Sequence, residues 1–366
     1  MGIYLINAGI IFFAGLFLTM QEGQPKRKKL FFLISSILLI AILGFRGKYV
    51  GEDTITYIKI AHSVEWLSWK EILSQFPRSS YGRIVYADGS YYTETMETGY
   101  LILNKIVMQI FHNPLYVQLL VAIIICIGFM KFIYDNSENV FLSVWVFLCE
   151  SLYISSFNGQ RQLLAMAISI QAYTYVKNEK YMKACIYILI GALFHASALI
   201  YFLLLLISMI KKYKTGIKVS IVAMGVSTVS LSAIAQIVSY IFPRYASYFH
   251  NTYWRGSVGG TVLVWAIEIF IFIVIYRSEI SNYQDYVCLA ILPLYLGMEI
   301  IGIQLTAIGR VALYFRAFMI LLFPGFLKYL KNRELKLVYF FGLMGINFLQ
   351  YYSAISSATR AYSFFE

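Results

Sequence analysis

The chain has 366 residues, of which 60% are hydrophobic and 13% charged, and its mean hydropathy is +0.70. This composition excludes an ordinary soluble domain and predicts an integral membrane protein made of α-helices. The apolar runs are too long and uniform for the alternating strands of a membrane barrel. The formal net charge of +12 lies mostly in short loops between apolar runs. Membrane insertion and anionic lipid explain that charge, so no nucleic-acid partner is expected.

The N-terminal part of the sequence predicts two membrane-spanning helices. The apolar runs Ile3–Met20 and Leu30–Phe45 flank a loop in which residues 26–29 are all basic. Basic short loops are typical of the cytoplasmic side of a membrane. This loop is therefore expected in the cytoplasm, and the N-terminus outside.

Residues 46–113 are expected to form a long extracytoplasmic loop. Apolar residues recur in it at helical spacing and predict an interfacial amphipathic helix: Trp66, Trp69, Leu73 and Phe76. Asp88-Gly89 lies between aromatic runs and indicates a small hairpin. The apolar stretch 97–113 is short and contains polar residues, so we expect it to be re-entrant or to lie on the membrane surface.

The remaining apolar runs complete one integral membrane domain, 1–366, with about twelve transmembrane helices and a range of about ten to fourteen. The stretch 184–210 decides the topology. As one span it would place four lysines outside, whereas a break at Phe194-His195-Ala196-Ser197 gives two short spans and returns those lysines to the cytoplasm: Lys211, Lys212, Lys214 and Lys218. We prefer the broken form.

Assigning the loops alternately to the two sides of the membrane separates lysine from arginine. The cytoplasmic side collects 17 of the 30 basic residues, 14 of them Lys, and the outer side holds 13, of which 9 are Arg. Insertion accounts for the lysines. An arginine guanidinium binds phosphate through two parallel hydrogen bonds and keeps its charge. The outer face is therefore expected to bind a phosphate group.

One candidate phosphate site is the start of an inward-running helix. Asn158, Arg161, Gln162 and Ala165 share one face of it, and the helix N-terminus itself favours an anion. The alternative is an interfacial arginine that merely reaches toward water. Arg310 and Arg316 head another entering helix, where Arg316 lies deep enough to need a partner. A structural ion pair between Arg316 and Glu268 is the alternative for that residue.

Two further segments carry candidate acid–base groups. His195 lies at the predicted break between two short apolar segments, where it is either a satisfied packing residue or a group that handles a proton. The segment after the second span holds Arg46, Glu52, Asp53 and Tyr57. Its carboxylates act either as a general base or as a cap for a helix that begins near Thr54.

Several motifs together resemble the EpsG-like branch of Wzy-type polysaccharide polymerases. In order along the chain they are Arg46 with Val50-Gly51-Glu52-Asp53-Thr54-Ile55-Thr56-Tyr57, Glu97-Thr98-Gly99-Tyr100, Asn158-Gly159-Gln160-Arg161-Gln162 with Ala165, and Phe194-His195-Ala196-Ser197-Ala198-Leu199. The resemblance covers roughly residues 40–320. Each motif is weak alone, but the ordered set is specific.

The resemblance implies a GT-C-like inverting glycosyltransferase of the bacterial inner membrane. It would join oligosaccharide repeat units carried on undecaprenyl diphosphate at the extracytoplasmic face, with a chain-length regulator and a flippase as further partners. Arg161 with Arg310 or Arg316 is expected on the diphosphate, and His195 or Asp53 is expected as the base. The other predicted substrate-binding residues are Arg46, Glu52, Tyr57, Asn158 and Gln162. The sequence has no Asp-x-Asp motif and no His/Asp cluster, so no metal or cofactor is expected.

Two other classes of protein fit part of the pattern. A flippase or transporter of the same lipid-linked sugar also needs arginines for the diphosphate, but its site must open to both sides. A membrane O-acyltransferase would use an intramembrane His on an acyl thioester. The crowding of arginine on one side favours the polymerase.

Overall fold

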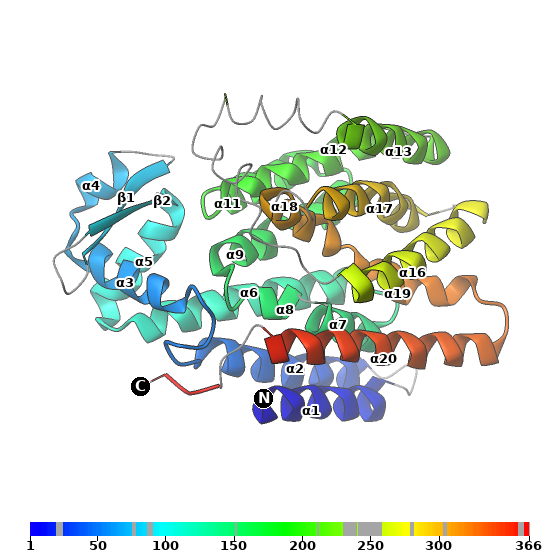
Figure 1. Ribbon diagram of the computed structural model, residues 1–366, viewed down its shortest axis with the longest axis horizontal. Coiled ribbons are helices and arrows are strands. Elements are labelled where there is room, and N and C mark those ends of the chain that lie inside the picture. The colour runs from blue at the N-terminus through cyan, green and yellow to red at the C-terminus, as the bar shows by residue number, and fades with distance from the viewer. Residues whose placement is uncertain are drawn as a thin grey trace.

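Most helices lie side by side along one direction in a computed structural model of the protein, and a small cap covers one end (Figure 1). The structure describes residues 1–19, 25–74, 78–85, 91–150, 152–210, 212–229, 240, 258–278, 282–302, 306–357 and 362–365. The helices outside the cap are α1 (Gly2–Thr19), α2 (Pro25–Gly44), α6 (Pro114–Asn136), α7 (Val140–Cys149), α8 (Leu152–Ser155), α9 (Gln160–Ser169), α10 (Ala172–Lys177), α11 (Tyr181–Ala192), η1 (Ala196–Tyr201), α12 (Phe202–Met209), α13 (Tyr213–Val229), α16 (Val258–Arg277), α17 (Tyr283–Gly302), α18 (Thr306–Arg316), α19 (Met319–Phe326), η3 (Leu327–Tyr329) and α20 (Arg333–Ser357).

The cap is formed by the segment predicted as an extracytoplasmic loop. It contains α3 (Thr54–Trp66), α4 (Trp69–Leu73), β1 (Arg78–Val85), β2 (Tyr91–Glu97) and α5 (Thr98–Phe111). The strands β1 and β2 pair antiparallel, so the predicted hairpin is confirmed, while its turn lies outside the described residues.

The predicted amphipathic helix of the cap is divided into two. α3 ends at Trp66, and α4 starts afresh because the Ser68 side chain and Glu71 form a capping box. Trp66, Trp69 and Leu73 are still exposed, as an interfacial surface requires. Phe76 lies outside the described residues.

The described helices fit a membrane protein. Three are long and apolar enough to cross a bilayer, namely α1, α6 and α17, and the pair α18–α19, bent by 45°, adds a fourth if it is one span. Several others are shorter apolar helices. The twelve crossings and the GT-C-like architecture stay predictions.

The predicted break around His195 is confirmed. α11 ends at Ala192, His195 has an extended backbone, and η1 with α12 follows. The far end of α12 meets the start of α17, where the Tyr286 hydroxyl donates to the Ile207 carbonyl at 2.8 Å. Tyr173 of α10 stacks on Tyr283 at the same place. The chain therefore runs along α11 and turns back, rather than continuing as one long helix.

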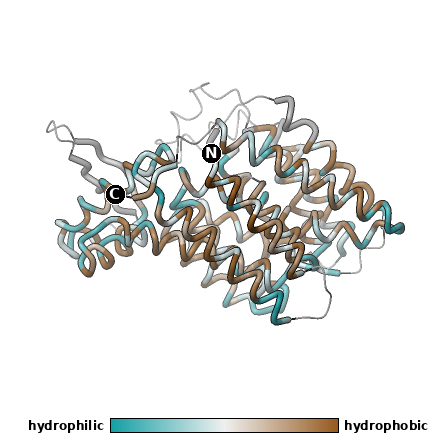
Figure 2. Tube along the Cα trace, turned by 90° about the horizontal axis from the view of Figure 1, so that it is seen from below, coloured by the Kyte–Doolittle hydropathy of each residue, from teal (hydrophilic) through white to brown (hydrophobic). Residues whose placement is uncertain are grey.

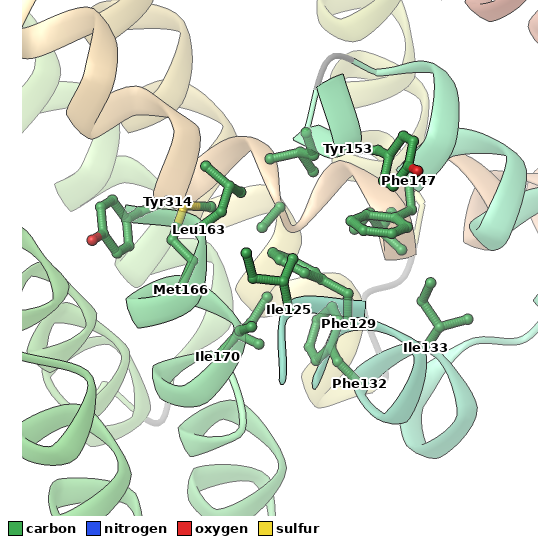
Figure 3. Packing of buried hydrophobic residues seen from close by; sticks show 14 of the residues in the cluster. Ile125, Phe129, Phe132, Ile133, Phe147, Tyr153, Leu163, Met166, Ile170 and Tyr314 are labelled. Carbon is green, nitrogen blue, oxygen red and sulfur yellow. The ribbon is translucent and has the colours of Figure 1, made fainter. Parts of the chain in front are cut away.

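Large apolar side chains from distant helices fill the interior. Ile125 and Phe129 of α6 lie beside Leu163 and Met166 of α9, and all four are fully buried (Figure 3). Burial of this kind stabilises the bundle by about 1.5–3 kcal/mol per large side chain. Hydrophobic residues run along the helices, and hydrophilic residues gather toward the helix ends (Figure 2).

The end of the bundle opposite the cap is held by charged side chains. Lys328 donates to Glu138 and to Asp285, each at 2.8 Å, and Tyr329 donates to the same Asp285. These contacts join the α6–α7 connection, the start of α17 and the end of α19. The network gives both carboxylates a positively charged partner.

Candidate functional site

Arg46 ties the end of α2 to the segment before α9. Its side chain is only 1% exposed; its Nε donates to Thr54 Oγ1 at 3.3 Å and its terminal nitrogens donate to Gln160 Oε1 at 2.7 Å and to the Leu43 carbonyl. Burial lowers the pKa of Arg46 to about 10, so the guanidinium remains charged at neutral pH. A fully engaged buried cation of this kind fixes the positions of its neighbours.

Asn158 receives the loop that follows Arg46. Its Oδ1 accepts the Glu52 backbone N–H at 2.9 Å, and its carbonyl accepts the Tyr57 hydroxyl at 3.1 Å. Asp53 is exposed at the start of α3, and its side chain does not cap that helix. The helix start predicted near Thr54 is confirmed, but capping does not explain the carboxylate.

Gly51 lets this loop approach the α9 segment closely. Its φ is +89°, and a Cβ there would lie 2.4 Å from the Phe157 carbonyl oxygen. We expect Gly51→Ala to lower the free energy of unfolding by about 1–3 kcal/mol because of strain and the clash. Thermal unfolding in detergent checks this against Gly345→Ala, which meets no atom within 4 Å. Equal stability of the two variants would contradict the assignment.

Glu97 reaches the site through a close backbone contact. β2 ends at Glu97, and the N–H of Gly99 in the first turn of α5 donates to the Leu193 carbonyl at 3.0 Å. A Cβ at position 99 would lie 2.6 Å from that oxygen, so only glycine permits the approach. The cap is thereby pressed against the turn that contains His195.

The Glu97 carboxylate joins two of the predicted site residues. Its Oε2 accepts from Arg161 at 2.8 Å, and its Oε1 lies 3.0 Å from His195 Nδ1 and accepts the Ala196 N–H at 3.2 Å. The side chains of Arg161 and His195 are 19% and 27% exposed, against 9% for Glu97. The arginine and histidine are thus partly exposed, and the carboxylate that joins them is buried more deeply.

Electrostatics keep this carboxylate ionised. Burial by itself raises the pKa of Glu97, but the hydrogen bond with His195 and the charge of Arg161 outweigh burial and lower the pKa to about 2. Burial raises the pKa of Tyr57, and the positive charge of Arg161 acts in the opposite direction. The Arg161 guanidinium therefore lies close to the Tyr57 hydroxyl. One arginine therefore connects the Glu97 carboxylate with the α3 side of the site.

Gln162 brings a second helix to the same place. Its side-chain amide donates to the Arg310 carbonyl at 2.5 Å, which fixes α18 against the start of α9. The Arg310 side chain is exposed. Arg161 and Arg310 thus come from helix segments that lie next to each other.

Arg316 lies in a separate cluster. Its Nε and a terminal nitrogen both donate to Glu150 Oε2, at 3.1 and 3.0 Å. The ion pair considered from the sequence joined Arg316 to Glu268, but Glu150 is the partner that the structure shows. Glu268 and Glu299 lie close enough to act on Arg316 electrostatically. Arg316 accordingly does not share the Glu97 cluster.

Comparison with known proteins assigns a family. A model of the EpsG family matches residues 29–366. The chain belongs to the EpsG family. Its apolar helices fit the membrane protein expected of that family, and the membership indicates a role of the polysaccharide-polymerase, glycosyltransferase type. No curated protein and no solved structure gives a match.

In this EpsG-family protein the predicted residues divide into three groups. Arg161, His195, Asn158 and Gln162 meet at the cap end of the bundle, with Arg310 beside them; Glu52, Asp53 and Tyr57 adjoin them through the Arg46 loop; and Arg316 stands apart. Their roles stay predictions. The described residues contain no group of three or more His, Cys, Asp or Glu side chains able to hold a metal ion.

Two residues of the EpsG-family site were not among those predicted. Glu97 bridges Arg161 and His195, and Gln160 holds Arg46. Both stand inside the motifs that carry the family resemblance, so the residues were visible in the sequence. Nothing in the spacing of a lone carboxylate indicated which partner it would find.

Proposed function

We propose that this EpsG-family protein is a GT-C-type inverting glycosyltransferase that polymerises undecaprenyl-diphosphate-linked oligosaccharide repeat units at the extracytoplasmic face of the bacterial inner membrane. The observation that carries the proposal is the convergence of Arg161, Glu97 and His195 from three distant segments. It supplies a cation for a leaving diphosphate and an imidazole for a hydroxyl proton. A chain-length regulator and a flippase are expected partners.

The charge distribution supports an outward-facing site. The basic residues 26–29 lie at the start of α2, and Arg46 follows the other end of that helix. Lys177 likewise ends α10, Lys180 lies between α10 and α11, and Lys183 is in the first turn of α11, at the end away from His195. Because Lys-rich short loops stay in the cytoplasm, the Glu97 cluster belongs to the outer side.

The proposed reaction breaks one glycosyl bond and forms another. The acceptor hydroxyl oxygen attacks the anomeric carbon of the donor, and the bond from that carbon to the undecaprenyl diphosphate breaks with its electron pair. Arg161 and Arg310 would take the developing negative charge, and a base would take the hydroxyl proton. Glu52, Tyr57, Asn158 and Gln162 would bind substrate. The contacts of Arg46 favour a positioning role over direct contact with the diphosphate.

His195 and Asp53 are the two candidates for the base. We expect His195→Ala to lower the polymerisation rate by about 10²–10⁴-fold, and Asp53→Asn to retain substantial rate, because a carboxylate beside arginine is a weak base at neutral pH. Polymer formation by the two purified variants from the same lipid-linked unit checks this. The opposite ranking would assign the base to Asp53.

Gel analysis of surface polysaccharide tests the proposed function against its rivals. Loss of a polymerase leaves single repeat units on the cell surface, loss of a flippase leaves no surface sugar, and loss of an O-acyltransferase leaves full-length polymer without an ester. We expect the first pattern from a deletion strain, with long chains restored by the wild-type gene. Either of the other patterns would overturn the proposal.

A further inference from the structure

We propose that Glu97 is a positioning residue that sets His195 as the general base, with Nε2 as the atom that accepts the proton. This inference rests on the proposed function. It concerns a residue that the sequence did not single out for a role, and it chooses one of the two nitrogens of the imidazole.

The contact between Glu97 and His195 determines which nitrogen of the ring carries the hydrogen. An ionised carboxylate only accepts hydrogen bonds, so the 3.0 Å contact with Glu97 Oε1 requires that His195 Nδ1 carries a hydrogen. In a neutral imidazole the other nitrogen then has a free lone pair. Nε2 is therefore the basic atom, held in that tautomer by Glu97.

The contacts of the Glu97 carboxylate all favour its ionised form. Its Oε1 accepts from the Ala196 N–H as well as from His195, and its Oε2 accepts from Arg161. All of these partners are donors, so a proton on the carboxylate would disrupt the arrangement. The pKa of about 2, against an ordinary 4.5, means that Glu97 contributes stability above about pH 4.5 and loses it as pH falls toward about 2. A pH change between 5 and 9 leaves Glu97 ionised.

The backbone on either side of the imidazole is also held in place. The backbone N–H of His195 donates to the Gly191 carbonyl at 3.1 Å. The turn continues with Ser197, whose hydroxyl donates to the Tyr314 hydroxyl of α18 at 3.0 Å. Arg161 and Tyr314 of α18 are the charged and titratable groups that the structure places near Glu97 besides His195. Glu97 itself contacts the imidazole.

The proton then has a complete route. As the acceptor oxygen bonds to the anomeric carbon and the diphosphate leaves, the hydroxyl proton passes to Nε2 and the imidazolium forms beside the Glu97 carboxylate, which stabilises it. Because the His195 side chain is 27% exposed, the proton can pass to solvent afterwards. The single carboxylate thus aligns the base and holds Arg161, the predicted ligand of the leaving group.

A double-mutant cycle on the full-length protein in liposomes tests the inference. Glu97→Gln keeps an oxygen that can accept from Nδ1 but removes the charge, and we expect a fall in kcat of about 10²–10⁴-fold with a smaller change in KM. In a His195→Ala background the same change is expected to cost at least about tenfold less, because the effect through the ring is gone and only the effect through Arg161 remains. Glu97→Asp is expected to restore part of the rate.

The pH profile gives a second reading that a merely structural role would not move. With Glu97→Gln the acidic limb of kcat against pH is expected to shift to lower pH, since loss of the carboxylate makes an adjacent imidazolium less favourable. An equal fall in rate on Glu97→Gln in the wild-type and His195→Ala backgrounds overturns the inference. If the His195→Ala rate is too low to measure, an acidic limb that does not shift in Glu97→Gln overturns it instead. Failure of the wild-type protein to make polymer in the same liposomes would instead overturn the proposed function.

Discussion

Replacing Arg161 by alanine is expected to stop polymer formation, with a rate loss on the order of 10²–10³-fold, while the protein stays in the membrane. Arg161 lies at the first turn of α9, where the helix dipole and its side chain both favour an anion. The negative charge on the leaving diphosphate grows in the transition state. A cation held in place by Glu97 needs no reorganisation at that moment.

Lysine and glutamine at position 161 separate charge from geometry. Arg161→Lys keeps the charge but loses the planar fork, so we expect partial activity; Arg161→Gln is expected to match alanine. Rates of polymer formation from a purified lipid-linked unit provide the measurement, with Arg333→Ala as the control, since Arg333 is exposed at the start of α20. Polymer of normal length and rate from Arg161→Ala would end the assignment of this residue to the diphosphate.

Removing Arg161 also leaves Glu97 without one partner, so stability must be read beside activity. Glu97 keeps its contacts with His195 and Ala196 in that variant. We therefore expect a modest fall in the unfolding temperature and a large fall in rate. A variant that loses both in proportion would indicate a structural role for the guanidinium.

The local part of the site could be predicted from the sequence. Asn158, Arg161 and Gln162 lie together at the start of a helix because spacing along one helix fixes relative position. The break at His195 followed from lysine placement, which is also a local rule. These predictions depend on neighbours in the chain and not on the packing of distant segments.

The long-range part could not be predicted. Glu97 meets His195 because Gly99 lets α5 touch the Leu193 backbone, and no pattern in the sequence announces that contact. Arg46 stands near the site, as predicted, yet Gln160 and Thr54 occupy its guanidinium. The sequence indicated that these charges lie near one another but could not say which partner each would contact.

The partner of Arg316 also depends on packing between distant segments, so the sequence could not predict it. Glu268 was the carboxylate considered from the sequence, but position in the chain does not distinguish it from Glu150 as a partner for the arginine. The structure places Glu150 at the point where α7 ends, and the arginine binds it through two nitrogens. Glu268 is completely buried nearby, and neither of its oxygens accepts a hydrogen bond in the part of the chain that the structure describes.

This asymmetry predicts opposite outcomes for two similar substitutions. Glu150→Gln removes the charge that neutralises the largely buried Arg316 guanidinium, and we expect it to lower the free energy of unfolding by about 3–5 kcal/mol. Glu268→Gln changes a fully buried side chain whose oxygens accept no hydrogen bond from the described residues, so the stability is expected to stay the same or rise. Both changes conserve shape, which makes each the control for the other.

Thermal unfolding of the purified variants, with polymer length as a second reading, decides between a structural and a substrate-binding role for Arg316. If Arg316 only holds α18 to the end of α7, Glu150→Gln is expected to lose stability and activity together, and Glu268→Gln to keep both. A stable Glu150→Gln variant that makes no polymer would place Arg316 in the reaction after all. Equal damage from the two substitutions would mean that Glu268, and not Glu150 alone, balances the arginine, since only a shared charge makes both carboxylates necessary.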